Sequence, residues 1–186
     1  FRLAHVHFGR EIIEVATFRG ASGDDGGADR VHENGRLLRD NVYGTIEEDV
    51  WRRDFTVNAL YYNIRDFSII DYVNGFKDHQ QGILRLIGDS EVRYREDPVR
   101  MLRAVRFSAK LDFQLDPESA KSMGEMANLL QDVPSARLYD EVLKLFLSGS
   151  AIAVFELLER YRLFAVLFPD TDKCLRQAEG DFPRAL

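Results

Sequence analysis

Residues 93–107 of this chain read RYREDPVRMLRAVRF and place an acidic pair, a proline and several arginines around one helix start. Asp97 and Pro98 are residue types that favour an N-cap and a first helical position, so we expect a helix to begin there. Three arginines then recur every third residue along one stripe of that helix: Arg100, Arg103 and Arg106. Capping explains the aspartate but leaves the arginines unexplained.

The acidic pair and the arginines together favour a site that binds a nucleobase and phosphate. Glu96 and Asp97 precede the first of these arginines by about one helical turn, so acceptors and donors lie in fixed relative positions. That arrangement suits hydrogen bonds to the edge of a base. The remaining arginines can bind phosphate, because a planar guanidinium offers two parallel donors where lysine offers a point charge. The alternative is a solvated, charged helix face.

A second arginine cluster lies in residues 52–58, which read RRDFTVN. Asp54 and Asn58 are four residues apart and would share one face of a helix. An adjoining apolar face is expected from Phe55, Ala59 and Tyr62. The spacing alone favours a plain surface ion pair between Asp54 and its neighbours Arg52 and Arg53.

Capping signals locate the helix expected to carry this second cluster. Thr45 and Glu48 form a T-x-x-E capping box, and acidic residues fill the first turn. We expect the helix to run from here to about Tyr62, with a break left open. Downstream the sequence predicts a strand at Phe67–Val73, a turn at Asn74-Gly75, a helical or loop segment at Phe76–Gly82 and a strand at Ile83–Ile87.

The first residues predict a β-hairpin. Phe1–Phe8 alternates and Glu11–Phe18 is rich in β-branched residues, with Gly9 as the expected turn between them. Because the chain starts without Met inside a strand pattern, we expect it to be a piece of a longer protein. Part of its sheet and of its active site is then expected to lie outside this sequence.

A long loop is expected after the hairpin. Gly20–Gly35 is glycine-rich, polar and nearly free of large apolar residues. Asp24 and Asp25 are interpreted as solvated residues of this loop, because neighbouring carboxylates on a flexible segment are not preorganised for a metal ion.

The second half of the chain is helical in period. From Asp97 to Leu186 the pattern breaks at four sites: Asp116-Pro117, Asp132–Pro134, Ser148–Ser150 and Pro169. We place a boundary near Gly88, between a mixed part and an all-helical part. The expected fold class is therefore α+β.

Composition excludes some classes of protein and leaves others open. The net charge of −6 and the pI near 5.3 argue weakly against a nucleic-acid partner. Local clustering overrides that total, since six arginines fall within 22 residues: Arg85, Arg93, Arg95, Arg100, Arg103 and Arg106. The single cysteine, Cys174, excludes an internal disulfide and indicates a cytoplasmic location. The histidines lack zinc-ligand spacing, and apolar runs are too short for a membrane span.

Four segments resemble consecutive motifs of the class II RNA nucleotidyltransferases, the family of bacterial poly(A) polymerases and tRNA CCA-adding enzymes. In chain order they are Glu11–Arg19, Arg52–Tyr62, Ile70–Asp78 and Arg95–Phe107. The segments LRDNVYGTIEEDVWRRDFTVNALYY and YVNGFKDHQQGILRLIG are most similar to the poly(A) polymerases of gamma-proteobacteria. The resemblance implies a partial head domain at residues 1–88, a helical neck at 89–148 and the start of a helical body at 149–186.

The resemblance implies template-independent addition of AMP from ATP to RNA 3′ ends, with release of pyrophosphate. CCA addition to tRNA and a non-catalytic RNA-binding module are the alternatives. The expected cofactor is Mg²⁺, held by carboxylates. The family's glycine motif followed by a D-x-D pair, which supplies the main metal ligands, does not occur in this sequence. We expect it upstream of Phe1, and we expect the chain alone to be inactive.

The matching motifs also imply roles for individual residues. Asp54 and Glu14 are rival candidates for the third catalytic carboxylate, and Glu14 is the candidate metal ligand. A strand-borne Glu14 would suit a metal, whereas Asp54 could equally orient arginines that hold the nucleotide. The residues expected around the nucleotide are Arg52, Arg53 and Asn58 for triphosphate and ribose, Asp97 and Arg100 for the base, and Glu96, Arg103 and Arg106 as supports.

Overall fold

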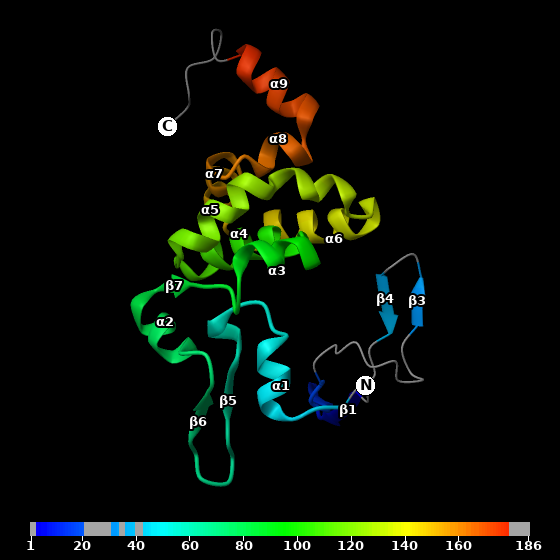
Figure 1. Ribbon diagram of the computed structural model, residues 1–186, viewed down its shortest axis with the longest axis vertical. Coiled ribbons are helices and arrows are strands. Elements are labelled where there is room, and N and C mark those ends of the chain that lie inside the picture. Colours follow the sequence, from blue (N-terminus) through cyan, green and yellow to red (C-terminus); the bar gives the residue numbers. More distant parts are fainter. Residues whose placement is uncertain (1–2, 21–30, 34–35, 40–42, 179–186) are drawn as a thin grey trace.

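The computed structural model describes residues 3–20, 31–33, 36–39 and 43–178. Strands and short helices occupy one end of the molecule, and a group of longer helices occupies the other (Figure 1). This mixed arrangement confirms the α+β class. Asp24 and Asp25 lie outside the described residues, so the expectation of a solvated loop there has no structural counterpart.

The N-terminal hairpin has the expected form. Strand β1 (Leu3–Phe8) pairs antiparallel with β2 (Glu11–Ala16), and Gly9 adopts a φ of +63° in the turn. All residues of both strands are exposed. A second antiparallel pair joins β3 (Val31–Glu33) to β4 (Arg36–Arg39). The expectation of a loop as far as Gly35 is therefore wrong for β3.

Helix α1 (Ile46–Trp51) starts with the predicted capping box. Thr45 Oγ1 accepts a hydrogen bond from Glu48 N at 3.2 Å, and Glu48 Oε2 accepts one from Thr45 N at 2.6 Å. The expectation that this helix continues to Tyr62 is wrong. The chain instead forms a 3₁₀ turn, η1 (Thr56–Asn58), and strand β5 (Leu60–Tyr62).

Burial of Phe55 explains why the helix stops early. Phe55 is fully buried, has extended backbone angles and forms an isolated β-bridge with Leu86. Strand β5 then pairs with β6 (Ile69–Asp71). Strand β6 is shorter than the strand predicted at Phe67–Val73 and covers only its central residues. Tyr62, expected on an apolar face, is 61% exposed on this hairpin. Partners distant in sequence thus replace a local helical pattern.

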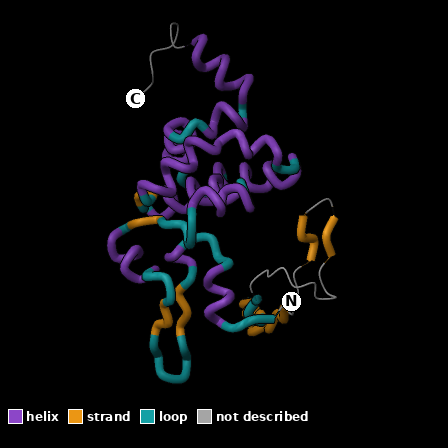
Figure 2. The backbone as a smooth tube through the Cα atoms, viewed as in Figure 1, coloured by secondary structure: helices purple, strands orange, loops and turns teal. Residues whose placement is uncertain are grey.

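Helix α2 (Gly75–Gln81) packs tightly against η1 because residue 75 is glycine. A Cβ at Gly75 would lie 2.1 Å from the carbonyl oxygen of Thr56. Strand β7 (Ile83–Leu84) follows, shorter than predicted, and pairs in parallel with β8 (Gln114–Leu115) from the helical end of the chain. This pairing ties the two ends of the molecule together (Figure 2).

The helical end matches the predicted breaks. Its elements are α3 (Ser90–Glu96), α4 (Val99–Leu111), α5 (Pro117–Met126), η2 (Ala127–Asp132), α6 (Ser135–Phe146), α7 (Ala151–Arg160), α8 (Leu163–Leu167) and α9 (Pro169–Ala178). Helix α4 begins one residue later than predicted, after Pro98, and Asp97 Oδ1 accepts from Val99 N at 3.3 Å. Arg162, with a φ of +61°, marks a break that the sequence did not predict. Within the described ranges, no helix is long and apolar enough to cross a membrane.

The main core is built around α4 and reaches across the junction between the two ends. Leu102 and Val105 of α4 are fully buried beside Phe55 and Leu84 from the mixed end. Arg85 reinforces the junction. It pairs with Asp78 of α2 and with Asp116, the N-cap of α5. The segment that carries Asp54 is therefore fixed directly beside α4.

Candidate functional site

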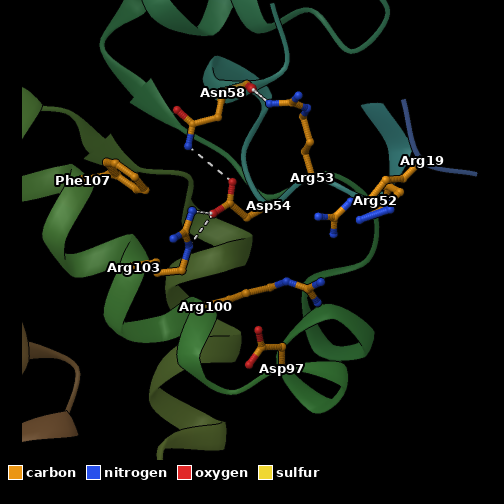
Figure 3. Close-up of a pocket in the computed structure, with 9 residues that line it drawn as sticks. All are labelled: Arg19, Arg52, Arg53, Asp54, Asn58, Asp97, Arg100, Arg103 and Phe107. Atoms are coloured by element: carbon orange, nitrogen blue, oxygen red, sulfur yellow. Dashed lines mark hydrogen bonds and ion pairs between the residues drawn. The ribbon is translucent and has the colours of Figure 1, made fainter. Parts of the chain in front are cut away.

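A cavity lies at this junction and has a volume of about 680 Å³, within the usual range for ligand sites. Figure 3 shows the nine lining residues: Arg19, Arg52, Arg53, Asp54, Asn58, Asp97, Arg100, Arg103 and Phe107. Seven of the ten residues predicted from the sequence are among them. Arg53 and Asn58 lie on one side of the cavity and Asp97 on the other, with Asp54, Arg103 and Arg100 between them.

The charge of the cavity is strongly positive. Five arginines and two aspartates line it, which leaves an excess of three positive charges. Such a site favours a polyanionic ligand, and guanidinium groups bind phosphate oxygens with favourable geometry. The acidic total of the chain is therefore reversed locally.

Asp54 joins the two predicted clusters. Its Oδ1 accepts from Phe55 N at 2.9 Å and from Asn58 Nδ2 at 3.3 Å, and its Oδ2 accepts from Arg103 Nε at 2.7 Å. The Arg103 guanidinium also lies 5.3 Å from the centre of the Phe107 ring. Of the two roles left open by the sequence, this geometry favours a carboxylate that orients Arg103 and Asn58.

Arg53 is held by Asp49 and Tyr61 on the opposite side of the cavity. Its Nη2 lies 3.0 Å from Asp49 Oδ2, and its Nε donates to Tyr61 Oη at 2.9 Å. Burial acts to raise the pKa of Asp49, but hydrogen bonds from Tyr61, Arg19 N and Arg53 outweigh it and hold that pKa below its ordinary value. Burial and the bond to Asp49 raise the pKa of Tyr61 to about 12, so its hydroxyl stays protonated.

Arg93 connects the segment that carries Arg52 and Arg53 to the start of helix α4. Its Nη2 donates to the carbonyl oxygens of Arg52 and Arg53, and its Nη1 donates to Glu96 Oε2 at 2.9 Å. The same Glu96 oxygen accepts from Arg100 Nη1 at 2.8 Å. Burial, followed by repulsion from Arg100, lowers the pKa of Arg93 below the ordinary arginine value, yet arginine stays charged. Glu96 thus supports Arg100 from outside the cavity wall.

Asp97 lies at the far end of the cavity and is paired with helix α6. Its Oδ2 accepts from Arg137 Nη2 at 2.8 Å, across a sequence separation of 40 residues. Arg100 follows Asp97 by one turn and donates to the carbonyl oxygen of Arg93 at 2.7 Å. Both side chains predicted to contact a base therefore line the same cavity, each held by a neighbour.

Three predicted residues lie outside the cavity wall. Glu96 has the supporting position already described. Arg106 points to Glu141, 4.0 Å away, and its guanidinium lies 4.7 Å from the centre of the Phe107 ring. Glu14 is exposed on β2, where Oε1 lies 3.6 Å from His5 Nε2 across the hairpin.

The described residues do not fit a complete metal site. No group of three or more histidine, cysteine, aspartate or glutamate side chains gathers in the described part of the chain. Both oxygens of Asp54 are already bound to donors. A D-x-D spacing does occur at Asp170 and Asp172, but it lies on α9, where Asp172 accepts from Arg176 at 2.8 Å.

Sequence reasoning missed several residues that form or support the cavity. Arg19 ends the first motif and Phe107 ends the last, but neither was assigned a role. Asp49 precedes Arg53 by four residues, which is a readable helical ion-pair spacing. Arg93 shows an i,i+3 ion-pair spacing with Glu96, but its contacts to the carbonyl oxygens of Arg52 and Arg53, 41 and 40 residues away, gave no signal in the sequence.

Comparison with known proteins gives matches over most of the chain. Residues 1–85 match the family model described as the Poly A polymerase head domain. Residues 112–175 match a model described as a probable RNA and SrmB-binding site of polymerase A. The two matched ranges flank residues 86–111, which contain α3, Asp97 and the whole of α4 with Arg100.

Individual relatives are similar at two levels. Poly(A) polymerase I of Salmonella typhi is 56% identical over 172 residues, which cover 91% of this chain and 37% of that protein. Poly(A) polymerase I of Haemophilus influenzae is 53% identical over 98% of this chain and 41% of its own length. A CCA-adding enzyme of Lactobacillus johnsonii is 34% identical over 79% of this chain and 35% of its own length. The chain thus spans about two fifths of these relatives.

A solved structure supports the fold. The Bacillus stearothermophilus CCA-adding enzyme, in complex with CTP, superposes with a TM-score of 0.74. It is 31% identical to this chain and aligns with 95% of it, which corresponds to 41% of the solved chain.

Proposed function

This chain belongs to the RNA nucleotidyltransferase family of bacterial poly(A) polymerases and CCA-adding enzymes, and we propose that its arginine-lined cavity binds ATP for transfer of AMP to RNA 3′ ends. In that reaction the 3′ oxygen of RNA attacks the α-phosphorus of ATP. The bond from that phosphorus to the β-phosphate bridging oxygen breaks, and pyrophosphate leaves with the bonding electrons. The hydroxyl proton passes to solvent or to a base.

The cavity is the observation that carries the proposal. It brings Arg52 and Arg53 of one motif together with Asp97 and Arg100 of another, although these two pairs of residues lie more than 40 positions apart in the sequence. An excess of positive charge suits a triphosphate, and a carboxylate with a guanidinium suits a base edge. The triphosphate and the base of the nucleotide would thus each contact a part of the cavity wall whose chemistry suits it.

ATP as the substrate is supported by the pattern of identities. Relatives named Poly(A) polymerase I are 53% to 56% identical over nearly the whole chain, whereas the CCA-adding enzymes are 34% to 39% identical over 61% to 79% of it. RNA as the acceptor is supported by the match of residues 112–175 to a model described as a probable RNA-binding site.

Mg²⁺ is the expected cofactor, because in-line phosphoryl transfer requires neutralisation of the leaving oxygens. We propose Glu14 as a metal-associated carboxylate, supported by its place in the Glu11–Arg19 motif and by its exposure on β2. Asp54 is proposed as an orienting residue of the nucleotide site. The head, neck and body ranges and the cytoplasmic location remain predictions.

An incorporation assay on the full-length protein tests the function. RNA with a free 3′ hydroxyl and tRNA lacking its CCA end are each incubated with one labelled nucleoside triphosphate and Mg²⁺. We expect AMP to be added repeatedly to RNA, with CMP, GMP and UMP added poorly. Addition of CMP to the shortened tRNA would identify a CCA-adding enzyme instead. RNA binding without any incorporation would identify a non-catalytic RNA-binding module.

A further inference from the structure

We propose that Asp49, together with Tyr61, is a positioning residue that fixes Arg53 in the orientation needed to hold the triphosphate of the nucleotide. This inference rests on the proposed function and goes beyond it, because neither residue lines the large cavity. Asp49 acts through Arg53 and through the backbone of Arg19, both of which do line it. The geometry around one carboxylate carries the argument.

The Asp49 carboxylate gathers three segments of the chain. Oδ1 accepts from Arg19 N at 3.1 Å, in the segment that follows β2. Oδ2 accepts from Arg53 Nε at 3.1 Å and from Tyr61 Oη at 2.6 Å, the latter on β5. The side chain of Asp49 is only 12% exposed, so its charge is compensated almost entirely by these partners. Such a carboxylate is a rigid anchor.

Tyr61 completes the anchor from the other side. Its hydroxyl donates to Asp49 and accepts from Arg53 Nε, so it bridges the ion pair. Its ring lies beneath the Arg53 guanidinium, at 5.0 Å from ring centre to Cζ. The same ring packs edge-on against Phe18 at 5.6 Å. Arg53 is therefore fixed in direction as well as in position.

The donors that Arg53 has left point to a ligand role. A guanidinium carries five N–H groups, and Arg53 uses Nε, one hydrogen of Nη2 toward Asp49 and one of Nη1 toward Asn58 O at 3.1 Å. Among the described residues, one N–H on each terminal nitrogen thus remains for a ligand. Two donors in a fixed plane match two oxygens of a phosphate.

A second cavity supports this interpretation. It has a volume of about 310 Å³ and is lined by Ala16, Thr17, Phe18, Arg19, Asp49, Arg52 and Arg53. Arg19, Arg52 and Arg53 line both cavities, so they form the wall between them. Asp49 is the carboxylate on the smaller side of that wall. Loss of its charge would release Arg53 from the wall toward either cavity.

The test compares variants of the full-length protein in AMP incorporation at varied ATP concentration, with ATP affinity measured separately by calorimetry. Asp49→Asn is expected to raise the KM for ATP and the Kd about tenfold to hundredfold with little change in kcat, because it removes a charge-assisted contact to a binding residue. Tyr61→Phe is expected to raise both about threefold to tenfold, since it removes one bridging hydroxyl. Glu47→Gln and Tyr62→Phe are the matched controls, on exposed neighbours in α1 and β5.

A double-mutant cycle separates positioning from general stability. If Asp49 acts through Arg53, the Asp49→Asn/Arg53→Lys double variant will bind ATP no more weakly than the worse single variant. Multiplied losses, or an unchanged KM in Asp49→Asn, would overturn the inference. Tyr61→Phe keeps the test decisive should Asp49→Asn fail to fold. If wild type binds ATP but adds no AMP, the proposed function fails, and the calorimetric cycle still tests the positioning role.

Discussion

The β1–β2 hairpin and the junction around Asp54 each carry one of the two candidates for the third catalytic carboxylate. Glu14 is exposed on a hairpin whose strand residues are all exposed, and His5 is its neighbour across the pair. Asp54 is 11% exposed and binds donors from its own segment and from α4. The hairpin is thus held by local pairing, whereas the junction is held by contacts between distant segments.

The difference separates two ways in which a carboxylate can serve a site. An exposed carboxylate has free lone pairs and can accept a ligand at little structural cost. A carboxylate that already accepts hydrogen bonds from arginine and asparagine has fewer lone pairs left for a ligand, and it acts by fixing the orientation of those partners. We therefore expect substitutions at the junction to affect stability and binding, and substitutions on the hairpin to affect chemistry alone.

The largest effect is expected from the apolar contacts of the two regions. Phe55→Ala should lower the free energy of unfolding of the chain by about 3–5 kcal/mol, because Phe55 is fully buried between Leu86 and Phe107. Phe8→Ala on the hairpin should change it by about 0.5 kcal/mol or less, since Phe8 is 76% exposed. Urea unfolding followed by circular dichroism measures both. Equal losses would show that the hairpin is as tightly packed as the junction.

The two rival acids give the next largest effect and the sharpest contrast. Asp54→Asn should raise the KM for ATP about tenfold to hundredfold and destabilise the protein, because Arg103 loses its charged partner. Glu14→Gln should lower kcat about a hundredfold with KM and stability unchanged, as befits a metal-associated carboxylate. Steady-state incorporation assays and thermal unfolding of the full-length variants distinguish the two. The reverse pattern would exchange the proposed roles.

Local signals account for the parts of the fold that the sequence predicted. The capping box at Thr45, the turn at Gly9 and the helix breaks at proline and glycine all depend on residues a few positions apart. One wrong prediction, a helix as far as Tyr62, concerns a segment whose structure is decided by Leu86 and β6. The residues of this segment do have helical periodicity, but burial of Phe55 in an extended conformation stabilises a different structure.

The candidate site shows the same division. Motif spacing identified Arg52, Asp54 and Arg100, and the structure brings them into one cavity. Motif spacing did not indicate the supporting role of Arg93, which donates hydrogen bonds to carbonyl oxygens on a segment distant in sequence. Backbone acceptors leave no trace in residue types, so no sequence pattern could have indicated this contact.

A smaller effect is expected from substitution of Arg93, which tests whether its hydrogen bonds hold the two sides of the junction together. Arg93→Lys keeps the charge but loses the planar fork that reaches two carbonyl oxygens and Glu96. We expect the KM for ATP to rise about tenfold, because Arg52, Arg53 and Arg100 lose a shared support. Arg95→Lys, on the same helix and paired with exposed Glu91 at 3.4 Å, should leave the KM unchanged. Equal effects would mean that α3 contributes only charge.

The smallest effect is the acid dependence of stability, which again contrasts the two regions. Bonds from Tyr61, Arg19 and Arg53 hold the pKa of Asp49 below its ordinary value of 3.8, against the opposing effect of burial. Because the folded-state pKa is the lower one, the stabilisation by Asp49 is complete above pH 3.8 and is lost as the pH falls through that lower value. Wild type should therefore be more stable than Asp49→Asn near neutral pH, and the gap should narrow in acid.

Urea unfolding of the chain at several pH values between neutrality and about pH 2.5 measures that gap. Glu11→Gln on the exposed hairpin is the control and should differ little from wild type at any pH, since Glu11 is exposed to solvent on β2. A gap for Asp49→Asn that stays constant with pH would mean that the amide substitution disturbs packing and not charge. In that case the anchoring of Arg53 would depend on the shape of the Asp49 side chain, and the contrast between a charge-held junction and a locally paired hairpin would fail at this residue.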